Sequence, residues 1–333
     1  MRRILIRVGI VLAVLALLVI AGYFILFPPY EPLTPTGSSP WATEIREYDT
    51  GLPETYADHS STRKLSVLYY YPTDRESASC PLVVFSHGAM GFKTSNESLY
   101  RELASHGYVV ASIDHTYQCL STKIGGKTIR IDGGFMKALQ NEDAKTDPVN
   151  SYACYQQWMG IRMGDIGFVI DMLTASGPDD FTRLVDPERI GVMGHSLGGA
   201  AALGMGRVRD DIKAVIALES PFMYDVTGVE DGAFTWDDAP YPVPMLNIYT
   251  DSSYAKLKTL PQYEQNANYL NSEREDVKNV YLPGCGHFSI TDLALSSPIL
   301  TRILNGVPGE ADRVDTLRAV SAECLSFFDQ WLK

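Results

Sequence analysis

Short apolar runs alternate with segments of helical spacing along most of the chain. Runs rich in β-branched and aromatic residues predict buried strands at residues 64–71, 81–88, 108–115, 189–196, 212–220, 244–250 and 277–284. Apolar residues that recur every three or four positions predict helices at residues 97–106, 156–173, 261–272 and 312–332, with a helix of small residues after Gly198. This alternation predicts a mostly parallel central sheet with helices on both faces.

Two polar stretches interrupt the alternation. Residues 119–151 and 221–243 contain glycine or acidic residues, and each follows a predicted strand. Loops in that position build the rim of an active site in α/β proteins. The sequence leaves open whether they shape a substrate pocket or are ordinary surface loops.

The N-terminus has a different pattern. Arg2, Arg3 and Arg7 precede the uncharged residues 8–27, a stretch of 20 residues that matches one membrane-spanning helix. The apolar core of a cleaved signal peptide is shorter, about 7–15 residues. We therefore expect an uncleaved anchor over residues 1–27, with its N-terminus in the cytoplasm and the rest of the chain outside it. A cleaved signal, which would release a secreted protein, and a buried helix are the alternatives.

The rest of the chain predicts a linker and one domain. Residues 28–41 are rich in proline, glycine and serine, which favours an extended spacer. Residues 42–333 contain no internal linker or repeat, so we expect one large α/β domain there.

Charge and cysteine content narrow the classes of partner. With 28 basic and 40 acidic residues the net charge is −12, and the basic residues do not cluster in the body, so nucleic acid is not an expected partner. Five cysteines leave at least one thiol unpaired in a monomer. Cys119 and Cys154 flank the first polar stretch and are a candidate pair, while five buried thiols are the alternative. No spacing typical of a structural zinc site is present.

The strongest chemical signal is Gly194-His195-Ser196-Leu197-Gly198, which lies between an apolar strand and a run of small helix-forming residues. A nucleophile elbow needs this context, because a sharp strand-to-helix turn lifts the serine hydroxyl above the sheet and glycines leave room for the turn. We therefore expect Ser196 to be a nucleophile in an α/β-hydrolase fold.

A serine hydroxyl becomes a good nucleophile when a base takes its proton. In this fold the histidine follows the serine in the chain, and only one of the six histidines does so. That residue is His287, in the glycine-bordered segment LPGCGHFS after the last predicted strand. Stabilising the oxyanion requires backbone amides after the nucleophile and after an earlier strand, which predicts Leu197 and Ala89.

Several blocks then indicate a family. The segments SHGAMG, LASHGYVVASIDH, IRMGDIGFVIDML, GHSLGGA, AVIALE and GCGHFSITDLALSSP occur in this order. From about residue 42 onward the chain resembles the platelet-activating-factor acetylhydrolases and the related bacterial esterases called predicted dienelactone hydrolases. The enzymes of that family are calcium-independent serine esterases, some of which cleave short acyl groups from phospholipids, and the resemblance implies the same type of reaction here.

Two carboxylates are candidates for the acid that orients the histidine. Asp251 follows the strand PMLNIYT, the usual position in this fold, but it opens the polar turn DSSY, which solvates it. Glu219 ends the apolar strand AVIALE, where an unpaired carboxylate would be costly. The family resemblance implies the second placement, although aspartate is usual there. We expect Glu219 to be the acid, with Asp251 as the alternative.

These residues predict two-step acyl transfer from a small-molecule or lipid-like ester to water, with no metal or organic cofactor. Acyl transfer to an alcohol and amide cleavage use the same triad. A membrane-tethered binding protein without turnover is the alternative from another class.

Overall fold

A computed structural model of the chain describes residues 2–56, 61–175, 181–306 and 311–333, and the side chains from residue 12 onward within these ranges. His59 lies outside the described residues. The centre of the fold is an eight-stranded sheet with the strand order β1-β2-β4-β3-β7-β8-β11-β12. The strands are β1 (Trp41–Pro53), β2 (Thr62–Pro72), β3 (Cys80–Ser86), β4 (Val109–Asp114), β7 (Val185–His195), β8 (Ile212–Leu218), β11 (Met245–Thr250) and β12 (Val277–Leu282).

The strands from β4 to β12 in this order are parallel, and β1 and β2 are antiparallel to their neighbours. The prediction of a mostly parallel sheet is therefore confirmed. Because the strands are parallel, their carboxyl ends lie at one edge, where polar side chains from several strands meet.

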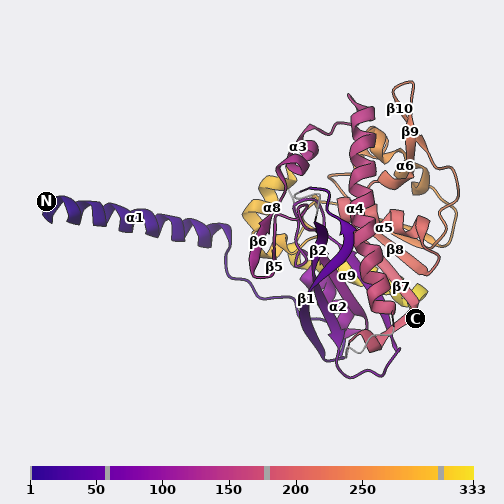
Figure 1. Ribbon diagram of the computed structural model, residues 1–333, viewed down its shortest axis with the longest axis horizontal. Coiled ribbons are helices and arrows are strands. Elements are labelled where there is room, and N and C mark those ends of the chain that lie inside the picture. The colour runs from indigo at the N-terminus through magenta and orange to yellow at the C-terminus, as the bar shows by residue number, and fades with distance from the viewer. Residues whose placement is uncertain (1, 57–60, 176–180, 307–310) are drawn as a thin grey trace.

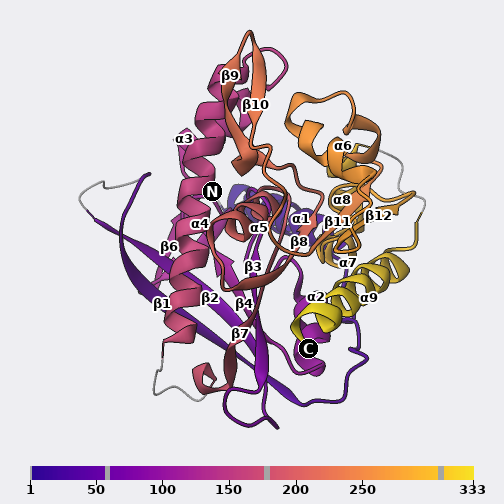
Figure 2. The same ribbon diagram turned by 90° about the vertical axis from the view of Figure 1, so that its right-hand side faces the viewer.

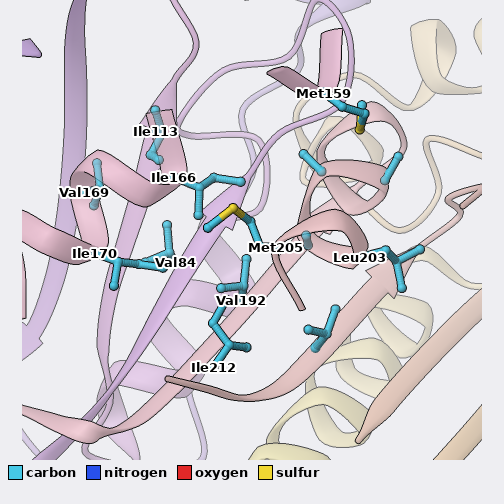
Figure 3. Packing of buried hydrophobic residues seen from close by; sticks show 14 of the residues in the cluster. Val84, Ile113, Met159, Ile166, Val169, Ile170, Val192, Leu203, Met205 and Ile212 are labelled. Carbon is cyan, nitrogen blue, oxygen red and sulfur yellow. The ribbon is translucent and has the colours of Figure 1, made fainter. Parts of the chain in front are cut away.

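Helices cover both faces of the sheet, as predicted. One face packs against α2 (Glu97–Ser105) and α9 (Arg313–Leu332), and the other against α4 (Pro148–Thr174) and α5 (Leu197–Val208). Alternate side chains of one strand serve the two cores, since Val84 lies in the α4 and α5 core, shown in Figure 3, while Val83 and Phe85 lie in the other. This burial on both faces explains why the strands read as continuous apolar runs.

Both polar stretches contain short elements that the sequence did not predict. The first contains β5 (Ser121–Ile124), β6 (Lys127–Arg130), α3 (Gly133–Asn141) and the first turn of α4, and the second contains β9 (Val226–Glu230) and β10 (Ala233–Trp236). Figure 2 shows α3 and the β9–β10 hairpin toward the same end of the molecule. Strands of four or five residues carry too little periodicity to be recognised in a sequence. The helix predicted from residue 156 begins at Pro148, because Asp147 caps it by accepting a hydrogen bond from the Asn150 amide.

The strand β1 was also missed. It is an edge strand with exposed Thr43, Ile45, Glu47 and Asp49 on one side and the half-buried polar side chains of Glu44 and Arg46 on the other, so it lacks an apolar pattern. The linker before it is partly docked on α2, since the Thr36 amide donates to Glu102 at 2.9 Å and the Ser39 amide to the Ser105 carbonyl at 3.0 Å.

The remaining helices lie outside the sheet layers. The first, α1 (Arg2–Leu26), projects from the body in Figure 1. Among the residues that the structure describes, no helix combines the length and the apolar character needed to cross a membrane. The other short elements are α6 (Glu264–Leu270), α7 (Leu293–Ser296), α8 (Pro298–Asn305) and the 3₁₀ turns Thr182–Leu184, Met223–Asp225, Tyr254–Lys256 and Pro261–Tyr263.

All five cysteines are buried free thiols. The candidate pair Cys119–Cys154 is therefore wrong, and the alternative of five buried thiols describes the protein. Burial raises the pKa of Cys119 to about 12, so this thiol stays neutral and acts as a small apolar side chain.

Candidate active site

Ser196 lies in the turn between β7 and α5. Its backbone has φ 54° and ψ −124°, a conformation that is uncommon for a residue with a side chain. The surrounding chain holds this conformation, because the Ser196 amide donates to the Leu218 carbonyl at 2.8 Å and its carbonyl accepts from the Ala200 amide at 3.0 Å. The turn presents the partly exposed side chain of Ser196 at the carboxyl edge of the sheet.

The glycines of the turn are required by close backbone contacts. A Cβ atom on Gly198 would lie 1.9 Å from the Ser86 carbonyl oxygen, and one on Gly194 would lie 2.4 Å from the Gly198 backbone. Backbone atoms at these distances cannot move aside without disturbing β3. The spacing that the sequence shows is therefore a packing requirement of the strand, turn and helix.

Two backbone amides next to Ser196 are available for a negatively charged oxygen. Among the described residues, neither the Leu197 amide nor the Ala89 amide donates to a protein acceptor. Leu197 is the first residue of α5, so its N–H points out of the helix, where the helix dipole favours negative charge. Ala89 belongs to the loop after β3, and a Cβ on Gly88 in this loop would lie 3.2 Å from the Ser196 Cβ.

His287 and Glu219 are in contact, with 3.2 Å between His287 Nδ1 and Glu219 Oε2. Glu219 follows β8 with a φ of 56°, and its side chain is buried. The other carboxylate oxygen accepts hydrogen bonds from the Ser253 hydroxyl at 2.5 Å and from the Thr250 amide. Burial by itself raises the pKa of Glu219, but His287, Ser253 and Thr250 together lower this pKa below its ordinary value. The buried group is therefore a carboxylate.

Asp251 lies elsewhere. Its carboxylate accepts a hydrogen bond from the Tyr281 hydroxyl at 2.5 Å and from the Gly284 amide at 3.0 Å. These contacts tie the turn after β11 to the end of β12 and to the segment that follows it. The structure thus brings Glu219, and not Asp251, against His287.

Neighbouring residues fix the His287 loop. The Ser252 hydroxyl accepts from the His287 amide at 2.9 Å, and His195 Nε2 donates to the His287 carbonyl at 2.9 Å. The rings of His195 and His287 lie 4.5 Å apart, which places the imidazole of His287 beside the serine turn. Within the described residues the Ser196 hydroxyl has no hydrogen-bond partner, and such contacts often form only when substrate is bound.

Sequence reasoning missed Ser252, Ser253 and the role of His195. The first two belong to the turn DSSY, which was read only as a solvated environment for Asp251. The available signal for Ser252 and Ser253 was their position directly after a predicted strand. The turns that follow neighbouring parallel strands lie at the same edge of the sheet, so these hydroxyls could be expected close to Glu219 and Ser196.

A buried trio near the site matches the spacing of metal ligands. One donor atom each of His87, Asp114 and Cys119 lies within 4.8 Å of the others. However, Asp114 already accepts from the Lys93 ammonium at 2.6 Å and from the Thr122 hydroxyl at 2.7 Å, while the Cys119 thiol stays protonated. A metal needs deprotonated, uncommitted ligands. The donor set fits an internal hydrogen-bonded cluster.

Comparison with known proteins agrees with this geometry. The model of the family "Platelet-activating factor acetylhydrolase, isoform II" matches residues 28–125 and 177–333. The platelet-activating factor acetylhydrolase of Cavia porcellus is 23% identical over 314 residues, covering 86% of this chain and 67% of that protein. Cutinase est1 of Thermobifida alba is 26% identical over 149 residues, covering 45% of this chain and 37% of the cutinase.

Solved structures share the fold. A ferulic acid esterase from Streptomyces cinnamoneus has a TM-score of 0.67 and 22% identity, with coverage of 91% of this chain and 93% of that one. A dienelactone hydrolase-like promiscuous phosphotriesterase from metagenomic libraries has a TM-score of 0.54 and 17% identity, covering 88% of this chain and 100% of that one. The fold is therefore that of the α/β hydrolases, and the resemblance seen in the sequence motifs is confirmed. The family model spans most of the chain, including Ser196, Glu219 and His287, so this protein belongs to the platelet-activating factor acetylhydrolase, isoform II, family.

Proposed function

We propose that Ser196, His287 and Glu219 are the catalytic triad with which this carboxylic ester hydrolase cleaves short-acyl or lipid-like esters. The observation that carries the proposal is the contact between His287 Nδ1 and the buried carboxylate of Glu219, beside the strained serine turn. Glu219 accepts the Nδ1–H of His287, which leaves Nε2 bare and able to take a proton from Ser196.

Acylation begins when the Ser196 oxygen attacks the ester carbonyl carbon. His287 Nε2 takes the hydroxyl proton, and the negative charge of the tetrahedral oxygen is bound by the amides of Leu197 and Ala89. When the intermediate collapses, His287 returns this proton to the leaving alcohol, and Ser196 is left acylated. Glu219 orients the ring and stabilises its positive charge during both transfers.

Deacylation repeats these steps with water. His287 takes a proton from water as the water oxygen attacks the acyl carbon, and the proton then passes to Ser196 as the acid leaves. The partial exposure of the His287 side chain, 26%, gives water a route to the base. No residue in this scheme requires a metal or an organic cofactor.

The names of the relatives and the apolar N-terminus support the proposed short-acyl or lipid-like substrate. Acetylhydrolase, cutinase and ferulic acid esterase are names of enzymes that act on esters of different sizes, and the family supports a short acyl group. A helix with exposed apolar side chains between Leu12 and Phe27 precedes the catalytic body, and such a surface is unfavourable in water. A lipid-like ester in a membrane matches both features.

The further proposal of a single-pass anchor, with the catalytic body on the extracytoplasmic side, rests on the 20 uncharged residues 8–27 of the sequence, since no helix among the described residues has the length and apolar character to cross a membrane. The arginines that precede it favour a cytoplasmic N-terminus. The last turn of α1 lies against the start of α8, since the Ser297 hydroxyl donates to the Leu26 carbonyl. Beyond this contact, Ile299 and Ile303 of α8 are also exposed, which suits a position close to lipid. Cleavage after α1 would instead give a secreted enzyme.

Replacement of the nucleophile tests the activity. Ser196→Ala should lower kcat on p-nitrophenyl acetate by about 10⁴ to 10⁶, because alanine fits the turn but removes the attacking oxygen. Ser66→Ala is a matched control, since Ser66 is a buried serine in β2 whose hydroxyl has no partner among the described residues. Activity of Ser196→Ala within tenfold of the wild type would refute the proposal. A series of p-nitrophenyl esters from acetate to dodecanoate then measures the acyl length that the site accepts.

A further inference from the structure

A cluster of buried polar side chains lies behind the loop that carries the Ala89 amide. It includes side chains from the end of β3, the segment after β4 and the middle of α4, namely Ser86, His87, His115, Gln118, Arg162 and Asp165. None of them belongs to the proposed triad. Arg162 and Asp165 also lie in residues 126–176, which the family model does not match.

The contacts of His87 define its protonation state. Its Nδ1 lies 2.6 Å from the Gly88 carbonyl oxygen, which only accepts, so Nδ1 carries the hydrogen. Its Nε2 accepts from the His115 amide at 3.3 Å, so Nε2 carries none. The ring is thus the neutral Nδ1–H tautomer. Burial lowers the pKa of His87 well below its ordinary value, with the Arg162 cation adding to this effect.

The hydrogen bond from His87 acts on the peptide that provides the oxyanion amide. The Gly88 carbonyl and the Ala89 N–H belong to one planar trans peptide and point in opposite directions. The Gly88 oxygen also accepts from the Gly91 amide at 3.0 Å. Two donors that hold this oxygen therefore set the direction of the Ala89 N–H on the opposite side of the peptide.

Arg162 holds the preceding peptide, between His87 and Gly88, in place. Its Nη1 donates to the His87 carbonyl and to the Ser86 hydroxyl, the latter at 3.2 Å, and its Nε donates to Gln118 Oε1 at 2.7 Å. The Gln118 carbonyl in turn accepts from the Met90 amide at 3.1 Å. The guanidinium thus contacts the oxyanion loop directly and also supports it through Gln118.

A buried ion pair lies beside Arg162 and is linked to it by hydrogen bonds. Asp165, one turn further along α4, pairs with Arg63 at 2.6 Å and accepts from His115 Nδ1 at 2.7 Å. His115 Nε2 then accepts from the Ser86 hydroxyl at 2.8 Å. The donor of each of these bonds is defined, which favours a rigid network, although Arg162 Nη2 is buried without a hydrogen-bond partner among the described residues.

We propose that His87 is a positioning residue of the oxyanion hole, whose neutral Nδ1–H imidazole, supported by Arg162, aims the Ala89 amide at the developing oxyanion. The inference rests on the proposed function, because it assigns a role to the Ala89 amide in the same reaction. A merely structural role would make any loss of activity follow the loss of folded protein, whereas a positioning role changes kcat in a protein that remains folded.

Two amide substitutions separate the two nitrogens of the ring. Asparagine places its amide near the Nδ1 position and keeps a donor for the Gly88 carbonyl, whereas glutamine reaches the Nε2 position and keeps only the partner of the His115 amide. In the full chain, His87→Asn should keep kcat within about tenfold. His87→Gln should lose about 10² to 10³ in kcat with little change in KM, the loss expected when one oxyanion donor is misplaced.

Affinity for a trifluoromethyl ketone provides a second readout, because its adduct with Ser196 carries an oxyanion. This affinity should fall with kcat in His87→Gln and not in His87→Asn, at unchanged melting temperature. Equal kcat in the two variants, or a loss confined to KM, would overturn the proposal. If neither variant folds, the long-range ¹H–¹⁵N spectrum of the wild type decides, since an Nε2–H or charged His87 ring contradicts it. Failure of the wild type to hydrolyse any ester would instead count against the proposed function.

Discussion

Glu219→Gln is the most informative change in the proposed triad. The Glu219 oxygen that accepts from Ser253 and Thr250 would be replaced by the amide oxygen, which keeps both hydrogen bonds. The amide nitrogen then takes the position 3.2 Å from His287 Nδ1. Because this nitrogen is a donor, it stabilises the tautomer with bare Nδ1 and protonated Nε2, and that Nε2 cannot accept the Ser196 proton.

The size of the effect follows from the lost tautomer. Neutralising the acid of a serine triad lowers kcat by about 10⁴, which corresponds to about 5.5 kcal/mol of transition-state free energy. The fold should survive, since glutamine has the same shape and keeps the contacts to Ser253 and Thr250. The loss should therefore be in kcat at a nearly unchanged melting temperature.

The assay is steady-state hydrolysis of p-nitrophenyl acetate, with Asp251→Asn as the control. That variant loses one of the contacts to Tyr281 and Gly284, so it should cost about 1 kcal/mol of stability and leave kcat within about threefold. The opposite pattern, with a large kcat loss in Asp251→Asn and less than tenfold in Glu219→Gln, would refute the reasoning and move the acid to Asp251.

Three further predictions concern the turn, the buried histidines and the N-terminus. Gly198→Ala should unfold the turn or cost at least about 3 kcal/mol of stability in urea melts, because its Cβ would lie 1.9 Å from a backbone oxygen. The control Gly160→Ala, in an open position on α4, should stabilise the protein by about 0.5 to 1 kcal/mol. Equal urea midpoints for the two variants would contradict the packing argument. The free energy of unfolding should fall as the pH drops from about 6.5 toward 4, with a slope that approaches about 4 kcal/mol per pH unit. The reason is that burial lowers the pKa of three histidines in the folded protein, so these side chains bind protons in the unfolded chain first. These are His115, with a pKa of about 4, and His87 and His195, whose pKa values lie well below the ordinary one. Urea midpoints that stay constant from pH 7 to 5 would contradict this assignment. The full chain should sediment with membranes while a chain beginning at Pro28 remains active in the supernatant, and a native mature N-terminus beyond Phe27 would exclude the uncleaved anchor.

The parts that the sequence predicted well carry a recognisable pattern within one short segment. The serine turn is marked by Gly194 and Gly198, whose missing side chains leave room for the turn itself and for the Ser86 carbonyl of β3. The buried strands are encoded by continuous apolar runs, because both faces of the sheet are covered. The edge strand β1 and the short hairpins were missed since their side chains lack a continuous apolar run, whereas the other edge strand, β12, was predicted.

The remaining features depend on partners far along the chain. Arg162 and His87 are 75 positions apart, and nothing in either segment indicates the other. The choice between Glu219 and Asp251 was argued from burial and from the family resemblance, and the contacts of Asp251 with Tyr281 and Gly284 come from a segment more than 29 positions away. The one available signal for the buried cluster was the pair Arg162 and Asp165 within the otherwise uncharged and mostly apolar residues 158–170, where charges need partners.

The central claim is that Ser196 becomes covalently acylated. The direct measurement is peptide mass spectrometry of the full chain after reaction with a fluorophosphonate, which modifies an activated serine. We predict one phosphonyl group on the peptide that contains Ser196, in proportion to the loss of esterase activity, and none in Ser196→Ala. Modification of a different residue that accounts for the loss of activity, or full activity after Ser196 is modified, would contradict the account.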